Sequence, residues 1–96
     1  MKKRMAKKMK FIYKNNEYEL MEMKEPHNNQ IFDMIAIFKV KYVTITKDLE
    51  KIEISKNEDY DFEDYDYINY FCKGAGDSPN EWIEIAKEYI DDYLNK

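Results

Sequence analysis

The chain has 96 residues, of which 44% are hydrophobic and 38% charged, with a net charge of −4. This length suits one domain with a single core and excludes a core plus a deep, enclosed active site. The hydrophobic content argues against a disordered chain. Residues 1–14 hold seven bases and no acid, whereas the rest carries nine bases and all 20 acids. We therefore expect an acidic body with a basic N-terminal arm.

The compartment follows from cysteine usage and hydropathy. Cys72 is the single cysteine, so no intramolecular disulfide can form, which fits a reducing cytoplasm. The basic start is not followed by the apolar segment of a signal peptide, and no apolar run approaches the roughly 18 residues of a membrane span. We expect a cytoplasmic protein with a flexible arm over residues 1–8, a single domain over residues 9–96 and no membrane partner.

The first half of the chain reads as sheet. A short β-prone segment, Met9–Tyr13, is followed by a turn over Lys14–Glu17, where asparagine tolerates positive φ. The returning strand would be Tyr18–Met23, ended by Pro26, and residues 26–30 would form a loop. The chain thus opens as a hairpin.

The main apolar element is Ile31–Thr46, whose second half alternates as a half-buried strand does. One face would carry Phe38, Val40 and Tyr42, and the other Lys39 and Lys41. The first half also fits helical spacing, but its density of isoleucine and phenylalanine favours a central strand. A turn over residues 47–49 would lead into a short strand, Lys51–Ser55. The links are too short for crossovers, so about four strands should form an antiparallel meander.

The next segment, Asn57–Phe71, contains six acids, six aromatics and no base. Apolar and polar positions here recur every three or four residues, and strict alternation breaks between Phe62 and Tyr65. This spacing predicts a helix, with acids in its first turn and Gly74 at its C-terminal end. The helical positions are Phe62, Tyr65, Ile68, Asn69 and Cys72. A strand over residues 66–72 stays open as an alternative.

A second helix is predicted at the C-terminus. Ser78 can cap it, Pro79 takes the first helical position, and Glu81 completes a capping box. The helix runs to about Leu94. Its apolar stripe consists of Trp82, Ala86, Tyr89, Ile90 and Tyr93. We expect an α+β fold in which an antiparallel sheet of three to five strands has two C-terminal helices packed on one face, with the stripe against Phe38, Val40 and Tyr42.

No segment carries a catalytic or metal-binding motif. The acids from Asp59 resemble the start of a calcium loop, but Asp64 and Tyr70 occupy the positions that need glycine and glutamate. His27 and Cys72 each lack a second residue of the same kind for a zinc site. We expect a protein that is not an enzyme and has no metal and no cofactor.

The acidic C-terminal part suggests binding to a protein partner. Asn57–Lys96 carries 12 acids and three bases, and carboxylates on rigid helices can enter a basic nucleic-acid groove of a partner. Tyrosines among the acids suit an interface. The alternative is that the acids only keep the domain soluble. The expected partner-binding residues are Asp59, Tyr60, Asp61, Glu63, Asp64, Tyr65, Asp66, Tyr67, Glu84 and Glu88.

In composition, Asn57–Lys96 resembles small phage-encoded inhibitors of host defence, including acidic anti-restriction and anti-CRISPR proteins that act as DNA mimics. The resemblance implies a non-catalytic inhibitor of a nucleic-acid-handling defence protein, such as a CRISPR or restriction enzyme. Two alternatives stay open. One is a nucleic-acid-binding accessory protein that neutralises phosphates with its arm, although the rest of the chain lacks a basic face. The arm residues concerned are Lys2, Lys3, Arg4, Lys7, Lys8 and Lys10. The other is a small-molecule or nucleotide-sequestering protein with aromatic pockets at an oligomer interface.

Overall fold

The structure is a computed structural model that describes residues 8–46, 48, 51–55 and 60–96. In chain order, the elements are β1 (Lys8–Tyr13), β2 (Asn16–His27), β3 (Gln30–Ile45), β4 (Lys51–Ile54), β5 (Phe62–Cys72), the short 3₁₀ helix η1 (Lys73–Ala75) and α1 (Pro79–Leu94). Of the predicted arm, Lys8 begins β1, and residues 1–7 lie outside the described residues. The same holds for residues 47 and 49 of the predicted turn, while Asp48 lies in a turn.

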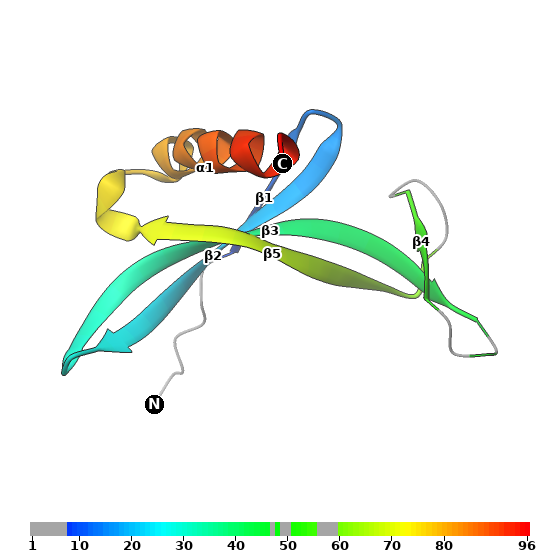
Figure 1. Cartoon of the computed structure of the whole chain (residues 1–96), viewed down its shortest axis with the longest axis horizontal. Coiled ribbons are helices and arrows are strands. Elements are labelled where there is room, and N and C mark those ends of the chain that lie inside the picture. Colours follow the sequence, from blue (N-terminus) through cyan, green and yellow to red (C-terminus); the bar gives the residue numbers. More distant parts are fainter. Residues whose placement is uncertain (1–7, 47, 49–50, 56–59) are drawn as a thin grey trace.

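The sheet is antiparallel throughout and is organised around β3. β2 pairs with the first part of β3, and β1 pairs with β2. Tyr42 and Val43 pair with β4 and β5 at the same time, so these two strands lie on opposite edges of β3. β5 therefore runs along one edge, and β4 extends the β2 edge beyond the first residues of β2 (Figure 1).

Two short asparagine-containing turns connect the first three strands. Lys14 and Asn15 have φ values of 51° and 66°, and Asn28 and Asn29 have 50° and 66°. Consecutive positive φ values suit tight hairpins because they match the twist of the strands. The prediction that Pro26 ends β2 is wrong. β2 continues to His27 with Pro26 opposite Ile31, beyond the reach of β1, so the missing N–H removes no bond to β1.

The start of α1 confirms Ser78 as the cap and Pro79 as the first helical residue, whereas the Glu81 carboxylate bonds the N–H of Asp77 and not that of Ser78, so the predicted capping box is displaced by one residue. Ser78 Oγ accepts a hydrogen bond from the backbone N–H of Glu81 at 3.3 Å, and Pro79 is the first helical residue. The Glu81 carboxylate reaches back and accepts from the N–H of Asp77 at 2.6 Å. The first contact satisfies an N–H group that a helix leaves unpaired at its start, and the second holds the residue that precedes the cap.

Trp82 fixes α1 to the turn that precedes it. Its indole Nε1 donates to the carbonyl oxygens of Lys73 at 3.1 Å and Gly76 at 2.9 Å. A Cβ atom at Gly76 would lie 2.9 Å from Trp82 Cδ1, whereas one at Gly74 would meet nothing within 4 Å. The close approach of the indole therefore requires glycine at position 76.

The core lies between α1 and one face of the sheet (Figure 1). Its buried residues are Tyr18, Leu20, Ile35, Ile37, Phe71, Trp82, Ala86 and Ile90. The prediction that α1 packs on Phe38, Val40 and Tyr42 is wrong, because these residues alternate with Ile35 and Ile37 and point to the opposite face. The first half of β3 is apolar on both faces, so alternation alone could not show which face meets the helix.

The predicted helix over the acidic stretch is also wrong. Phe62–Cys72 forms the edge strand β5, so the five-stranded sheet carries one C-terminal helix and not two. Two features of β5 produce the helix-like spacing. Phe62 and Tyr65 pair with Val43 and Val40 and therefore point to opposite faces of the sheet, which breaks the apolar alternation. In addition, Ile37 pairs with Asn69 but Phe38 pairs with Tyr67, which leaves Ile68 as an extra residue in a β-bulge and shifts the alternation beyond it by one residue. Cys72 is exposed at the end of this strand.

Candidate functional site

The face of the sheet turned away from α1, here called the open face, is not covered by a helix of the described part of the chain (Figure 1). Directly paired residues point to the same face of a sheet, so the strand register gives its members. They include Lys8, Lys10, Ile12, Glu17, Glu19, Met21, Met23, Glu25, Phe32, Met34, Ala36, Phe38, Val40, Tyr42, Glu63, Tyr65, Tyr67, Tyr70 and Cys72. None of the described helices or strands packs on this face.

Part of the open face is hollowed into an apolar groove of about 630 Å³. Its lining residues are Met23, Glu25, Pro26, Phe32, Met34, Ala36, Tyr67, Tyr70 and Cys72. Several large side chains of this groove are exposed, with Tyr67 at 54% and Tyr70 at 51%. An exposed cluster of this kind on a small domain is typical of a site that binds a partner or ligand.

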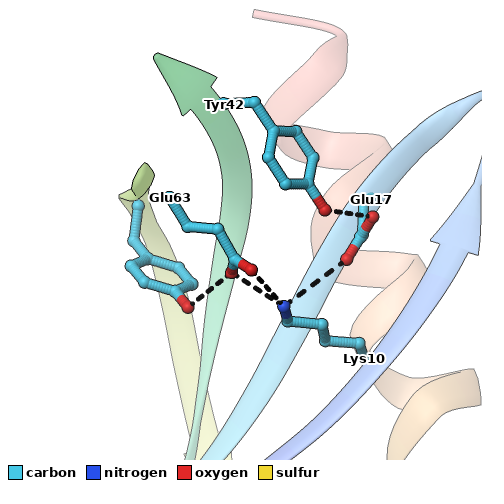
Figure 2. Close-up of polar contacts among 5 residues, drawn as sticks. Lys10, Glu17, Tyr42 and Glu63 are labelled. Atoms are coloured by element: carbon cyan, nitrogen blue, oxygen red, sulfur yellow. Dashed lines mark hydrogen bonds and ion pairs between the residues drawn. The ribbon is translucent and has the colours of Figure 1, made fainter. Parts of the chain in front are cut away.

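A polar network adjoins the groove on the same face, shown in Figure 2. The Lys10 ammonium donates to both carboxylate oxygens of Glu63, at 2.8 and 2.7 Å, and lies 3.8 Å from Glu17. The Tyr42 hydroxyl donates to Glu17 at 2.8 Å, and the Tyr65 hydroxyl donates to Glu63 at 3.0 Å. The network joins β1, β2, β3 and β5, so it fixes strands that are distant in sequence.

The electrostatics of this network keep it in one protonation state at neutral pH. Burial, followed by the Glu17 carboxylate, raises the pKa of Tyr42 to about 12. Burial and the Glu63 carboxylate raise the pKa of Tyr65 to about 12 as well. The hydrogen bond with Glu63 raises the pKa of Lys10, and the same bond lowers the pKa of Glu63. Both tyrosines are therefore hydrogen-bond donors, and the lysine and glutamate form a stable ion pair.

Glu19 is the one buried charged residue among the described residues, with 2% of its surface exposed. It lines a shallow hollow together with Lys8, Lys10, Glu63 and Tyr65. Its Oε2 atom is buried and has no hydrogen-bond partner among the described residues. Buried polar atoms normally have partners, so an unpaired carboxylate oxygen beside a hollow calls for an explanation.

The predicted partner-binding residues do not form one surface. Tyr60, Glu63, Tyr65 and Tyr67 lie on or beside the open face, and the ring of Tyr60 contacts that of Tyr42 in a tilted arrangement with 4.4 Å between the ring centroids. Asp64 and Asp66 point to the other face of the sheet. Asp61 accepts a hydrogen bond from the N–H of Ile45 at 2.9 Å. Glu84 and Glu88 lie on α1, and Asp59 lies outside the described residues.

Most of the β5 acids are paired with lysines of the same chain. Asp66 lies 3.2 Å from Lys41, which also contacts Glu53 at 2.8 Å, and these two carboxylates raise the pKa of Lys41. Asp64 lies 3.7 Å from Lys51. On the helix, Glu84 pairs with Lys87 at 3.0 Å. Such pairing lowers the net negative field that a partner would meet.

The cations of the basic arm are only partly described. Lys2, Lys3, Arg4 and Lys7 lie outside the described residues, while Lys8 and Lys10 lie on β1 and face the open side. Among the described residues, no group of three or more histidine, cysteine, aspartate or glutamate side chains could hold a metal ion. Nor is any helix of the described part long and apolar enough to cross a membrane.

Several residues of the open face were not anticipated as functional, namely Met23, Phe32, Met34, Ala36, Tyr70, Cys72 and Glu19. The sequence contained a weak signal for this apolar face, because methionine alternates with glutamate over Met21–Met23 of β2 and the first half of β3 is apolar on both faces. Comparison of the chain with protein-family models, with curated proteins and with solved structures gives no match. The geometry of the open face is therefore the basis for assigning a class of protein.

Proposed function

We propose that this chain is a non-catalytic binding protein that docks onto a protein partner through the open face of its sheet. The observation that carries the proposal is the apolar groove, whose aromatic and methionine side chains are exposed and lie opposite the face that α1 covers. Clustered aromatic side chains supply much of the binding energy at protein interfaces.

The geometry of the groove supports tight binding because its aromatic wall is ordered by neighbouring rings. Phe38 makes edge-to-face contacts with Tyr65 at 6.1 Å and with Tyr67 at 5.7 Å between ring centroids. Rings held in place before binding lose less conformational freedom on association. Methionines on β2 and β3 form the adaptable part of the surface, since their unbranched side chains adjust to a partner's shape.

Inhibition of a nucleic-acid-handling defence protein by an acidic surface is a second candidate. Internal ion pairs engage Glu63, Asp64 and Asp66, so this candidate now depends on α1, where Glu84 and Glu88 lie one turn apart and are exposed. Glu84 also pairs with Lys87, but its side chain stays 71% exposed. A rigid row of carboxylates can enter a basic groove. As part of the same proposal, the single exposed thiol of Cys72 favours a reducing, cytoplasmic location.

The test is capture of partners from a nuclease-treated lysate by three tagged proteins. The first is the wild type, and the second is the groove variant Phe32→Ser/Tyr70→Ser. The third is a control, Ile45→Ser, which removes an exposed apolar side chain at the end of β3 that lies on the other face of the sheet and outside the groove lining. Circular dichroism and thermal unfolding show that all three are folded. A partner lost by the groove variant and kept by the control supports the proposal, and a partner kept by the groove variant overturns it.

A fourth protein, Glu84→Gln/Glu88→Gln, separates the two candidates. Loss of a basic, nucleic-acid-handling partner by this variant alone favours the acidic surface of α1. The groove volume also lies within the range of small-molecule sites. Native mass spectrometry of the purified protein tests the sequestering alternative, because a bound small molecule would appear as added mass.

A further inference from the structure

We propose that the open face binds a partner segment that presents apolar side chains to the groove and a cationic side chain to Glu19. This inference rests on the proposed function, since it names the chemistry of the partner that the open face takes. It is carried by the buried carboxylate oxygen of Glu19, which has no hydrogen-bond partner in the described part of the chain, and by the charge balance of the face around it.

The charge on the open face favours a basic partner. On the described strands, this face carries four carboxylates and two ammonium groups. They are Glu17, Glu19, Glu25 and Glu63 against Lys8 and Lys10. Lys10 lies opposite Glu19 across β1 and β2, but its ammonium donates hydrogen bonds to Glu63 and lies 3.8 Å from Glu17, and among the described residues it makes no ion pair with Glu19. The one charged residue that lines the groove itself is Glu25.

The position of Glu19 fits a cation that sits beside an aromatic ring. Glu19 pairs with Phe38 across β2 and β3, and Phe38 contacts both Tyr65 and Tyr67. A lysine or arginine side chain placed here would donate a charge-assisted hydrogen bond to Glu19 and could lie over a ring face. The carboxylate would gain the partner that it lacks among the described residues.

The distance between Glu19 and the apolar groove further defines the partner segment. Glu19 and Met23 lie four residues apart on β2, which corresponds to about 13 Å at roughly 3.3 Å per residue. Met23 and Met34 pair directly and line the groove. A suitable segment therefore carries its cation about 13 Å from its apolar anchors. In a partner helix this is roughly two turns, at about 5.4 Å per turn.

A second copy of this chain fits the face less well. Self-docking would bring four carboxylates and two ammonium groups against an identical set, an arrangement with like charge on both sides. A basic and apolar segment meets complementary charge instead. The chain's own residues 1–7 are basic too, so the test below is designed to detect them as the occupant.

Cys72 provides a direct readout of groove occupancy, because it is the single cysteine of the chain and lines the groove. The probe is a synthetic peptide of leucine and lysine with helical spacing, about 14 residues long, roughly the shortest length for an isolated helix. A matched peptide has glutamate in place of every lysine. The rate of Cys72 alkylation is measured in the full chain with increasing amounts of each peptide.

The lysine peptide is expected to slow alkylation of Cys72, and the glutamate peptide is expected to leave the rate unchanged. Glu19→Gln should weaken binding of the lysine peptide about tenfold, the scale of one charge-assisted hydrogen bond. Glu22→Gln is the control, because Glu22 lies on the other face of β2 and contacts Lys73. Protection should also decline as salt is added.

Other outcomes overturn the inference. Equal protection by both peptides, or none by either, would show that the open face does not select a cation. The proposed function would stand in either case if the groove variant still lost its captured partner. Protection that rises with protein concentration alone would identify a second copy as the occupant. Faster alkylation after removal of residues 1–7 would identify the chain's own N-terminus.

Discussion

The buried carboxylate of Glu19 should destabilise the fold, so its replacement by an apolar side chain should stabilise it. Glu19 is 2% exposed, and its Oε2 has no partner among the described residues. An unsatisfied buried polar group costs about 1–3 kcal/mol. Methionine is unbranched and of similar length, so it can fill the same space. We expect Glu19→Met to raise the free energy of unfolding by about 1–3 kcal/mol.

The assay is urea and thermal unfolding, followed by circular dichroism and by fluorescence of Trp82, the single tryptophan. For a domain of this size, 1 kcal/mol shifts Tm by about 4–8 °C, so the expected rise is roughly 4–24 °C. Glu63→Met is the matched control, since it removes a carboxylate from the same face that is paired with Lys10. It should not stabilise the protein.

One result would refute this reasoning. If Glu19→Met lowers stability as much as Glu63→Met does, the Glu19 carboxylate has a partner in solution, and the cation-binding inference loses its basis. If Glu19→Met stabilises the fold and abolishes binding of the lysine–leucine peptide, the residue is retained for binding at the expense of stability.

Three further predictions concern the turn, the ion pair and the sheet edge. Gly76→Ala should destabilise the fold by about 1–3 kcal/mol because its Cβ would clash with the indole, whereas Gly74→Ala should not; urea unfolding of both measures this. The pKa of Glu63 is lowered in the fold, so the ionised carboxylate stabilises the fold above its unfolded pKa, and this stabilisation is lost as pH falls through the folded pKa. In unfolding experiments between pH 7 and about pH 2, Glu63→Gln should therefore lose less stability than the wild type. The side chains of Asp64 and Asn69 accept hydrogen bonds from the next backbone N–H on the edge strand β5. Their replacement by alanine frees these N–H groups to pair with another chain, so the double alanine variant should self-associate in analytical ultracentrifugation. The Asp64→Asn/Asn69→Asp variant keeps both acceptors and should behave as the wild type does.

The sequence was sufficient to predict the structure where interactions between residues close in the chain determine it. The start of α1 at Pro79 follows from side-chain capping, which depends on residues within four positions of one another. The hairpin between β1 and β2 follows from an asparagine turn and alternating strands. Both predictions were confirmed because no distant part of the chain competes with these signals.

The sequence was insufficient where pairing between distant strands decides the structure. The bulge at Ile68 can be recognised only once β5 is aligned with β3, and without it the spacing from Phe62 to Cys72 indicates a helix. The face of β3 that meets α1 is likewise chosen by packing, because Ile35, Ala36, Ile37 and Phe38 form an apolar run with no polar face. The open face was missed for the same reason.

The acidic stretch shows why composition is a poor guide to surface charge in this protein. The composition of Asn57–Phe71 predicts a segment with a high density of negative charge. The register of β5, however, places Asp66 near Lys41 and Glu63 near Lys10 of β1. Charges that alternate between two faces of a strand cannot form one patch, and pairs within the chain reduce what remains. Glu19 is the exception, because its Oε2 has no hydrogen-bond partner among the residues that the structure describes, and it lies beside the exposed Tyr65. A partner that meets this face gains most from burying its own apolar side chains, and the cation that it offers to Glu19 sets which partner is accepted.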